Sequence, residues 1–343
     1  MEFKESWESR LRQSTESFLP LVSVVLLNWN GERHIHRCID HLLAQTYQSI
    51  EMILVDNGSS DGSLQRIKAR FPDFTYIENG ENLGYAAGMN RGIEVSRGAF
   101  VILLNQDACL DTQFVSQCIE KIMQDDMLGA IGGRVLCWLK DRLTSTLRKG
   151  EGEHSVVRKR FQGDGGNVSD RPMLTFAAAG CFPFLRREML EDLRNTSGYY
   201  YDEAYVTGWE DFDLYFRMHL RGWKCLFVPT AVGWHVGSGS VGGNATFFSK
   251  STEYQVRILR NRYFTIIKDV PLILLLRLSP YLALTEAALP FYFIIRSPRS
   301  LSALVSAWYH VLRASPSLMR KRLLIQRSRT VDGMYLRRYF VRL

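Results

Sequence analysis

The first hundred residues alternate apolar runs with helical patterns, and no other feature of the sequence constrains the fold as strongly. Four runs of β-branched, aromatic and large aliphatic residues predict strands, at 21–27, 52–55, 74–77 and 100–104. A helical pattern ends at Ala44, and another covers 84–95. Strands that alternate with helices at this spacing require right-handed βαβ units. The sequence therefore predicts an α/β fold with an open, mostly parallel sheet that is flanked by helices.

Polar clusters follow three of these predicted strands, at 28–31, 56–63 and 105–107. The clusters are rich in Asn, Asp, Gly and Ser beyond what a connecting loop requires. Ligands of open parallel sheets bind beyond the carboxyl ends of the strands. We therefore expect a ligand site along this edge of the sheet.

The first two clusters have the chemistry to hold a nucleotide. Asp56 ends a strand directly, and its carboxylate can accept hydrogen bonds from the N–H of a pyrimidine base. Gly58 lets the backbone approach a ligand closely. The amides of Asn28, Asn30 and Asn57 are further candidates for nucleotide contacts. The alternative is a plain Asx turn that caps the next helix.

A helix start with small residues follows the third predicted strand. Gly84 begins this helix, and Asn90 and Arg91 lie about two turns along it. The N-terminus of such a helix, with an arginine nearby, is suited to a diphosphate. By itself this motif is weak evidence.

Asp107 is the candidate for a metal ligand. A hydrophobic strand delivers this acid after Asn105 and Gln106, and apolar sequence then resumes. One carboxylate combined with nucleotide phosphates is a common way to hold Mg²⁺ or Mn²⁺. The alternative is a lone solvated aspartate in a loop.

The stretch 207–240 combines acids, a helix, a strand and a histidine, and we expect the chemistry there. Glu210, Asp211 and Asp213 precede an apolar-periodic run, which predicts the first turn of an amphipathic helix. Acids at that position also stabilise a helix through its dipole, so a purely structural role remains the alternative. His235 follows on the predicted strand, beside Trp234. In the structural alternative, His235 simply packs against Trp234.

Two other segments have distinctive composition. The small residues of 177–180 either leave room for a sugar or allow a strand to pack tightly on a helix. The charged, glycine-containing segment 138–171 is predicted to be a mobile loop.

The C-terminal part is apolar and then strongly basic. The segment 270–295 has about the length of a bilayer span, and Arg277, Glu286 and three prolines interrupt it. From Arg296 onward eleven Lys/Arg face one acid, Asp332, whereas the whole chain has a net charge of +8. We interpret the region 270–343 as interfacial on an anionic membrane rather than spanning, with lipid favoured over nucleic acid as its partner. The alternative is a buried helical hairpin.

Cysteine usage and the N-terminal residues indicate the compartment. The six cysteines form no C-x-x-C pair and lie in or beside apolar runs, which fits reduced thiols and predicts neither a zinc site nor a disulfide framework. The polar leader 1–20 has no apolar core of a signal peptide. We expect the protein in the cytoplasm, peripheral on the cytoplasmic face of the membrane.

The order of the motifs resembles glycosyltransferase family 2, the inverting nucleotide-sugar transferases of the GT-A fold, and looks most like its bacterial rhamnosyltransferase-type members. The resemblance runs from about residue 22 to 268 and is carried by VSVVLLNWNG, ILVDNGSSDGS, ENLGYAAGMNRG, VILLNQDA, AAAGCFPFLRREML, YDEAYVTGWEDFDLYFRMHLRGWK, VGWHVGSGS and RNRYFTIIK. It implies three regions: a leader 1–20, a GT-A domain 21–268 and a helical, membrane-associating extension 269–343.

The resemblance also implies roles for individual residues. Asp56 would bind the nucleotide base, Asp107 would end the metal motif, Asp211 would be the catalytic base, and His235 would approach the metal or the diphosphate. The sequence departs from the family's D-x-D-like pattern, because Asn105 replaces the first acid of that motif. Glu210 stays open as the base.

The implied activity is sugar transfer from a nucleotide-diphosphate donor to a hydroxyl of a glycan or lipid-linked acceptor in cell-surface polysaccharide synthesis. Subfamily resemblance alone suggests dTDP-rhamnose as the donor, and UDP-hexoses remain open. A dehydrogenase is disfavoured, because the glycine pattern at 237–242 comes late and lacks the acid expected about twenty residues on. A nucleotidyltransferase would want cations after the first strand, where 28–31 has none. A processive synthase would want a Q-x-x-R-W motif and several clean spans, and an inactive sugar-binding homologue is the non-catalytic alternative.

Overall fold

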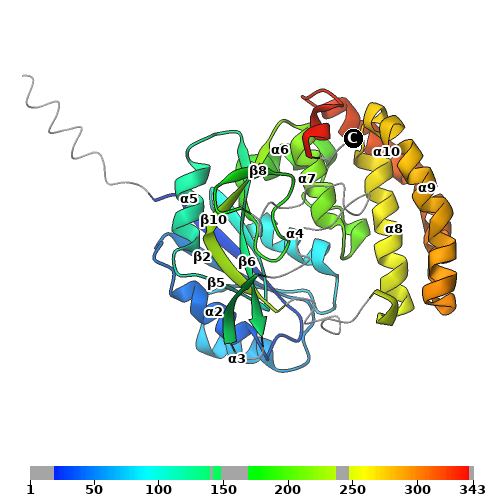
Figure 1. The fold of residues 1–343 in the computed structure, drawn as a ribbon. Coiled ribbons are helices and arrows are strands. Elements are labelled where there is room, and N and C mark those ends of the chain that lie inside the picture. The colour runs from blue at the N-terminus through cyan, green and yellow to red at the C-terminus, as the bar shows by residue number, and fades with distance from the viewer. Residues whose placement is uncertain (1–18, 140–141, 148–168, 237–246, 340–343) are drawn as a thin grey trace, which may run out of the picture.

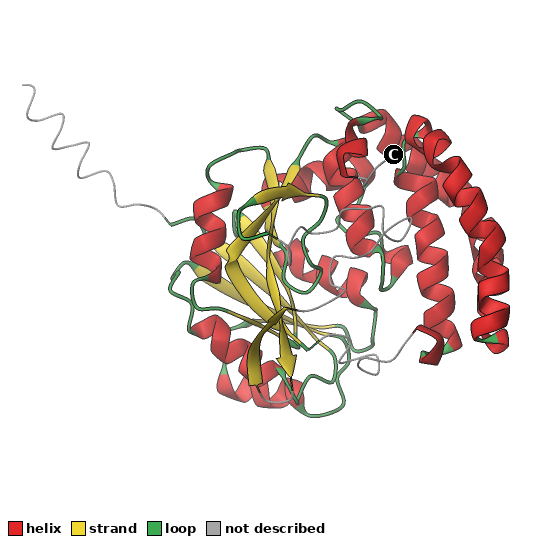
Figure 2. Cartoon of the chain, in the orientation of Figure 1, coloured by secondary structure: helices red, strands yellow, loops and turns green. Residues whose placement is uncertain are grey.

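The computed structural model describes residues 19–139, 142–147, 169–236 and 247–339. Within these ranges ten strands form one mixed sheet in the order β3-β2-β1-β4-β9-β6-β10-β5, with β7 beside β6 and β8 beside β10. Figure 2 shows this sheet with helices against both of its faces. The strands are β1 (Val22–Asn28), β2 (Ile50–Asp56), β3 (Thr75–Glu78), β4 (Phe100–Asn105), β5 (Ala108–Leu110), β6 (Leu128–Leu139), β7 (Arg142–Leu147), β8 (Met173–Thr175), β9 (Phe184–Arg186) and β10 (Lys224–His235).

The N-terminal half of the sheet is parallel, and its strands lie within two residues of the predicted positions. β1 pairs in parallel with both β2 and β4, and β2 pairs in parallel with β3. In this register Asn28 lies opposite Asp56, and Leu27 lies opposite Asn105. The polar clusters therefore meet at one edge, as the alternation of strands and helices predicts.

The other half of the sheet is mixed, which the sequence pattern did not predict. β9 is antiparallel to β4 and β6, and β5 is antiparallel to β10. β5 and β9 are only three residues long, which is too short to show an alternation of apolar and polar residues. The β5–β10 register places His235 opposite Ala108, the residue after Asp107. This pairing joins two parts of the site that are far apart in the sequence.

Helices bury both faces of the sheet, so the core has two halves. Alternate residues of β1 enter different halves: Val25 joins one, and Val24 and Leu26 join the other. This explains the continuous apolar run of that strand. The helices of this region are α2 (Ile35–Leu43), α3 (Ser63–Arg70), α4 (Tyr85–Val95), α5 (Phe114–Ile122), α6 (Arg187–Ser197) and α7 (Glu210–Leu220). The six cysteines are free thiols, five of them buried.

Three long helices form a layer beside α7, on the far side of the molecule from α5 (Figure 1). They are α8 (Thr252–Asp269), α9 (Leu272–Arg296) and α10 (Leu301–Ser328), and α8 contacts both α7 and α10. α9 continues through Pro280 and Pro290. Among the described helices, α9 meets the length and hydropathy of a membrane span, and 11% of its most apolar window is buried. The segment 270–295 is therefore largely exposed, and the alternative of a buried hairpin is wrong.

Candidate active site

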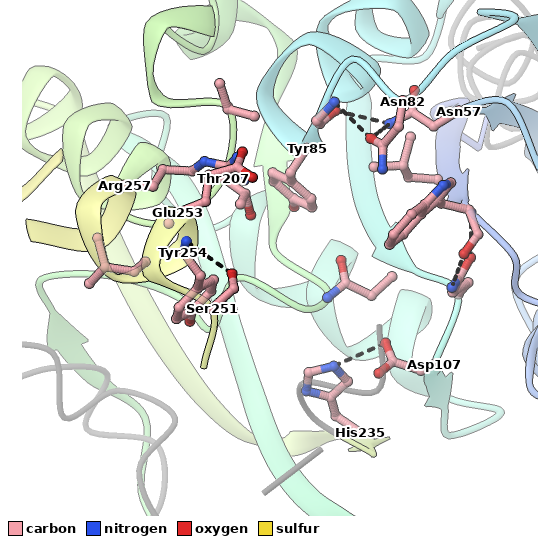
Figure 3. A pocket seen from close by; sticks show the side chains of 18 residues that line it. Asn57, Asn82, Tyr85, Asp107, Thr207, His235, Ser251, Glu253, Tyr254 and Arg257 are labelled. Atoms are coloured by element: carbon pink, nitrogen blue, oxygen red, sulfur yellow. Dashed lines mark hydrogen bonds and ion pairs between the residues drawn. The ribbon is translucent and has the colours of Figure 1, made fainter. Parts of the chain in front are cut away.

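A cleft of about 650 Å³ opens at the carboxyl ends of the parallel strands. Three groups of residues form its wall: the ends of β1, β2, β4 and β10, the loops before α4 and α7, and the first turns of α8 (Figure 3). The described residues that line it are Leu27, Trp29, Asn57, Asn82, Gly84, Tyr85, Asn105, Gln106, Asp107, Val206, Thr207, Gly208, His235, Ser251, Glu253, Tyr254, Arg257 and Ile258.

The predicted site residues divide into two sets. Six of them line the cleft: Asn57, Gly84, Asn105, Gln106, Asp107 and His235. The others lie outside its lining: Asn28, Asn30, Asp56, Gly58, Asn90, Arg91, Glu210 and Asp211. The glycine pattern at 237–242 and most of the charged segment 138–171 lie outside the described residues.

Asp107 and His235 form a pair at the base of the cleft. His235 Nε2 lies 3.1 Å from Asp107 Oδ1, and the two side chains are 9% and 11% exposed, respectively. Figure 3 shows the two side chains pointing toward one another. Burial by itself raises the pKa of Asp107. The charge and hydrogen bond of His235, a backbone hydrogen bond and the charge of His34 together outweigh it, so the carboxyl pKa lies below its ordinary value. Asp107 is therefore a carboxylate at neutral pH.

The donor chemistry of this pair fits a divalent cation that shares its remaining positions with phosphate and water. A carboxylate oxygen and an imidazole nitrogen suit Mn²⁺, while Mg²⁺ prefers oxygen. Among the described residues no group of three or more His, Cys, Asp or Glu side chains could hold a metal.

Gln106 connects the metal motif to the first polar loop. Its Oε1 accepts a hydrogen bond from the backbone N–H of Trp29 at 2.6 Å, and its Nε2 donates to the Trp29 carbonyl at 2.9 Å. The side chain of Gln106 is thus used to hold the Trp29 loop against β4. Neighbouring Asn105 lines the cleft.

Asp56 is buried inside a network rather than exposed in the cleft. Asn28 Nδ2 donates to Asp56 Oδ1 at 2.7 Å, and Ser59 donates its hydroxyl to Oδ1 and its backbone N–H to Oδ2. Asn30 accepts from the backbone of Ser60. The structure therefore uses Asn28, Asn30 and Asp56 to shape the loop behind the cleft. Asn57, one residue further, reaches the cleft itself.

The predicted diphosphate residues of α4 also lie elsewhere. The Arg91 side chain is 53% exposed and pairs with Glu94 at 3.9 Å. Its helix buries the opposite face, so Arg91 points to solvent and the prediction that it lies near the phosphates is wrong. Asn90 is buried, and its amide bonds both backbone groups of Tyr201 and the Glu203 carboxylate.

Other residues of the α4 region contribute to the cleft. Gly84 has φ +85°, and a side chain there would collide with Val206. Gly58 has φ +72° and packs its backbone against residues 80–81. Positive φ and close backbone approach require glycine at both positions, and of the two only Gly84 is among the described residues that line the cleft.

Glu210 and Asp211 begin α7 beside the cleft, directly after the lining residues Thr207 and Gly208. Burial raises the pKa of Asp211 to about 7. Burial, followed by the charge of Asp211, raises the pKa of Glu210 well above its ordinary value. Asp211 Oδ1 and Glu210 Oε2 are buried and make no hydrogen bond within the described chain. A carboxylate with a pKa near 7 and an unpaired oxygen is suited to take up a proton.

The small residues at 177–180 serve packing and also make room for Asp211. A side chain on Gly132 of β6 would crowd Ala178, so this part packs tightly on the sheet. A methyl group on Gly180 would stand 2.9 Å from Asp211 Cγ and closer still to its Oδ2. Tyr85 donates to the Gly180 carbonyl at 3.1 Å. Gly180 therefore sets where the Asp211 carboxylate can lie.

A strained turn forms the cleft wall just before α7. Val206, Gly208 and Trp209 all have positive φ, and two of them are not glycine. Such conformations cost energy and persist only where the surroundings hold them. The buried amide Asn261 Nδ2 on α8 lies within hydrogen-bond distance of the carbonyls of Tyr205, Thr207 and Gly208, at 2.9, 3.1 and 2.7 Å. Asn261 thus stabilises the turn that leads into Asp211.

Asp213, the third acid of the helix start, has a structural role. It is fully buried, and it pairs with Lys268 of α8 at 2.6 Å and with Arg217 at 2.7 Å. Lys268 also pairs with Asp202, which in turn binds Lys321 of α10. This cluster ties α7 to the C-terminal helices, so the structural alternative is correct for Asp213.

Two contributors from α8 escaped the prediction. Arg257 is the one arginine or lysine among the described lining residues, and it also pairs with Glu253 of the same helix. Asn261 lies four residues on. Asn261 lies within the segment RNRYFTIIK that carries part of the family resemblance, and Arg257 lies three residues ahead of it. The sequence of this region gives no indication of which residues face the cleft.

Comparison with curated proteins gives similar enzymes. The chain is 26% identical over 226 residues to the poly-beta-1,6-N-acetyl-D-glucosamine synthase of Staphylococcus aureus, covering 65% of this chain and 51% of that protein. It is 32% identical over 115 residues to glycosyltransferase GlyG of Streptococcus pneumoniae, covering 33% and 38% of the two chains. The chain thus spans about half the length, or less, of these curated relatives.

Solved structures share the fold at low identity. GalNAc-T7 with UDP, GalNAc and Mn²⁺ superposes with a TM-score of 0.52 at 17% identity, covering 73% of this chain and 48% of that chain. The mannosyltransferase PcManGT of Pyrobaculum calidifontis, with GDP-Man and Mn²⁺, gives 0.51 at 17% identity, covering 97% and 91%. TarS of S. aureus in complex with UDP gives 0.51 at 16% identity, covering 92% and 91%.

A family model covers the part of the chain from β1 into α6, which leaves β10 outside the match. Residues 23–194 match the model described as glycosyl transferase family 2. The match ends ahead of α7, so it includes Asp107 but not Glu210, Asp211 or His235. The mixed, mostly parallel sheet with its flanking helices is the GT-A arrangement, and the chain belongs to glycosyl transferase family 2.

Proposed function

We propose that this protein is an inverting glycosyltransferase that moves a sugar from a nucleotide-diphosphate donor to an acceptor hydroxyl. The observation that carries the proposal is the position of Asp211. Its carboxyl has a pKa near 7 and an unpaired oxygen, and it lies beside a cleft that contains Asp107 and His235. Acid, cleft and candidate cation site are the parts that such a transfer requires.

In the proposed step, Asp211 accepts the proton of the acceptor hydroxyl while that oxygen bonds to the anomeric carbon of the donor. The bond between the anomeric carbon and the phosphate oxygen breaks, and its electron pair leaves with the nucleoside diphosphate. Attack from the face opposite the diphosphate inverts the configuration. General-base assistance of this kind contributes roughly 10²- to 10⁴-fold.

The cleft supplies positive charge for the leaving diphosphate. Arg257 lines it and keeps its guanidinium near Glu253. Mg²⁺ or Mn²⁺, held by Asp107 and His235, would offset the negative charge of the donor phosphates. Asn57 and Asn105 line the same cleft and are candidates to contact the nucleotide.

We propose dTDP-rhamnose as the donor, with UDP-hexoses as the competing class, and a glycan or lipid-linked hydroxyl as the acceptor. The name of the poly-beta-1,6-N-acetyl-D-glucosamine synthase supports a role in making polysaccharide, and we propose that this polysaccharide belongs to the cell surface. We retain residues 21–268 as the transferase region. The donor would enter from the cytoplasmic face of a membrane.

The test is release of nucleoside diphosphate by the purified full chain, with Mg²⁺ or Mn²⁺, across a panel of nucleotide sugars and acceptors. Asp211→Asn should lower transfer by at least roughly 10²-fold while donor affinity, measured by calorimetry, stays within a few fold. Glu210→Gln is the matched variant one residue away and should retain far more activity. If Glu210→Gln loses transfer and Asp211→Asn retains it, the base is Glu210 instead. A wild-type chain that binds donors without turnover would point to an inactive homologue.

A further inference from the structure

Exposed apolar side chains gather on the two outer helices. Of the 21 exposed large hydrophobic residues in the described chain, 14 lie on α9 and α10. The most exposed are Leu284, Phe291, Ile295 and Leu312, which are 71%, 67%, 79% and 73% exposed. A concentration of exposed apolar side chains on neighbouring helices is typical of an interaction site. We call the exposed side of these helices the α9–α10 face.

α10 has two apolar sides, of which only one is needed for folding. Its buried side includes Ala303, Leu304, Ala307, Leu318 and Ile325. A second set at helical spacing points outward, and consists of Val305, Tyr309, Leu312, Met319 and Leu323. Packing of the fold does not account for this outward stripe.

The charges around this face have one sign. Between 272 and 331 the single acid is Glu286, and it is taken up by the Arg262 guanidinium at 2.6 Å and by the Tyr263 hydroxyl. Seven arginines in the same span are exposed, at 277, 296, 299, 313, 320, 327 and 329. A second copy of the chain would bring arginine against arginine. An anionic lipid surface complements both the apolar and the cationic side chains.

The C-terminal end of α9, residues 291–295, lies close to the segment that leads into the cleft-lining first turns of α8. Its Tyr292 and Phe293 contact Phe248, with ring centroids 5.6 and 5.2 Å apart. Phe248 precedes Ser251, which lines the cleft. Figure 1 shows this end of α9 beside the start of α8. We call residues 291–295 the apolar tip.

We propose that the α9–α10 face docks on an anionic bilayer and inserts the apolar tip, which places the cleft beside the lipid headgroups. α9 lies on the surface rather than crossing, because Leu274, Leu278 and Phe293 are buried against the protein and Glu286 is tied to α8. Docking itself is independent of the proposed function. The identity of the acceptor as a lipid-linked hydroxyl rests on that function.

The experiment is flotation of the full chain with vesicles of phosphatidylcholine, with or without phosphatidylglycerol. We expect the chain to float with the anionic vesicles and much less with phosphatidylcholine alone. The tip variant Phe291→Ser/Ile295→Ser should lose binding at least roughly tenfold, since two large apolar side chains leave the bilayer. Arg313→Gln/Arg320→Gln should lose up to about 30-fold, from about 1 kcal/mol for each basic residue.

A matched control uses two large apolar residues that are also exposed and lie far from this face. Leu43→Ser/Met123→Ser alters side chains that are 55% and 56% exposed on α2 and next to α5, and should float like the wild type. Equal loss in the control and tip variants, or no flotation of the wild type, overturns the proposal.

Retention in the membrane after carbonate extraction would show that α9 spans. A dimer in light scattering that the tip variant abolishes would assign the face to a second copy. Nucleoside diphosphate release with a soluble acceptor, measured on the same variants, reports separately on the transferase.

Discussion

Gly180→Ala should displace the Asp211 carboxylate, the proposed base, without unfolding the protein. A methyl carbon at this position lies 2.9 Å from Asp211 Cγ and closer to Oδ2, whereas ordinary contact begins at 3.4 Å. Gly180 is not among the residues with positive φ, so the backbone accepts alanine. The obstructing atoms belong to the end of a short side chain, which can turn away. Ordinary contact at Oδ2 returns only after a shift of more than 1 Å, and a misplacement of about 1 Å already costs about 10²-fold in rate.

The assay is steady-state transfer, with donor affinity by calorimetry and stability by thermal denaturation. We expect kcat to fall roughly 100-fold, with donor affinity and Tm close to wild type. Gly132→Ala is the control, because its methyl group would crowd Ala178 of the same segment at about 3.1 Å but not Asp211. That variant should lower Tm and keep kcat. If Gly180→Ala retains kcat within a few fold, Asp211 is not the base or does not act from this position.

Three further predictions concern groups around the cleft. Because the pKa of Asp211 is raised to about 7, kcat should rise as the pH increases through 7. The stability that this carboxyl contributes should fall as the pH rises from about 4 to above 7. A flat pH–rate profile together with denaturation midpoints that do not change with pH would contradict this. Asn261→Asp replaces the amide donor with an oxygen that faces three backbone carbonyls. KM for the donor should then increase roughly tenfold, because the strained turn before α7 is no longer held. An unchanged KM would show that Asn261 does not contribute to donor binding. Lys268→Met leaves Asp202 and Asp213 without their shared cation, and chemical denaturation should show a loss of about 3–5 kcal/mol, whereas a neutral result would mean that Arg217 and Lys321 compensate.

Local patterns were enough to predict the architecture around the site. The apolar runs at 21–27 and 100–104 became β1 and β4, and the acids at 210–213 became the first turn of α7. These features depend on periodicity, polar turns and helix-start chemistry, each of which acts over a few residues. The short strands β5 and β9 carry no such pattern, and long-range pairing alone determines them.

The sequence predicted which types of residue form the candidate site, but it did not predict which individual residues line the cleft. Asp107 and His235 are 128 residues apart in the sequence and lie together, as the family resemblance implied. Arg91 has a suitable charge but lies on the solvent side of α4, because the face of α4 that packs on the sheet contains Ala86, Met89 and Ile93. Arg257 supplies the cleft with positive charge instead, from a helix that begins more than 150 residues later.

The sequence by itself determined the parallel sheet and the polar edge on which ligands bind, because strand alternation and turn composition are local properties. Only the tertiary structure decided which polar residues face the cleft and which hold loops. It also gave Asp211 and Asp213 different surroundings. Two residues apart on a helix, these acids point about 200° apart in ideal geometry. One carboxylate meets Gly180 beside the cleft, and the other meets Lys268 in the core.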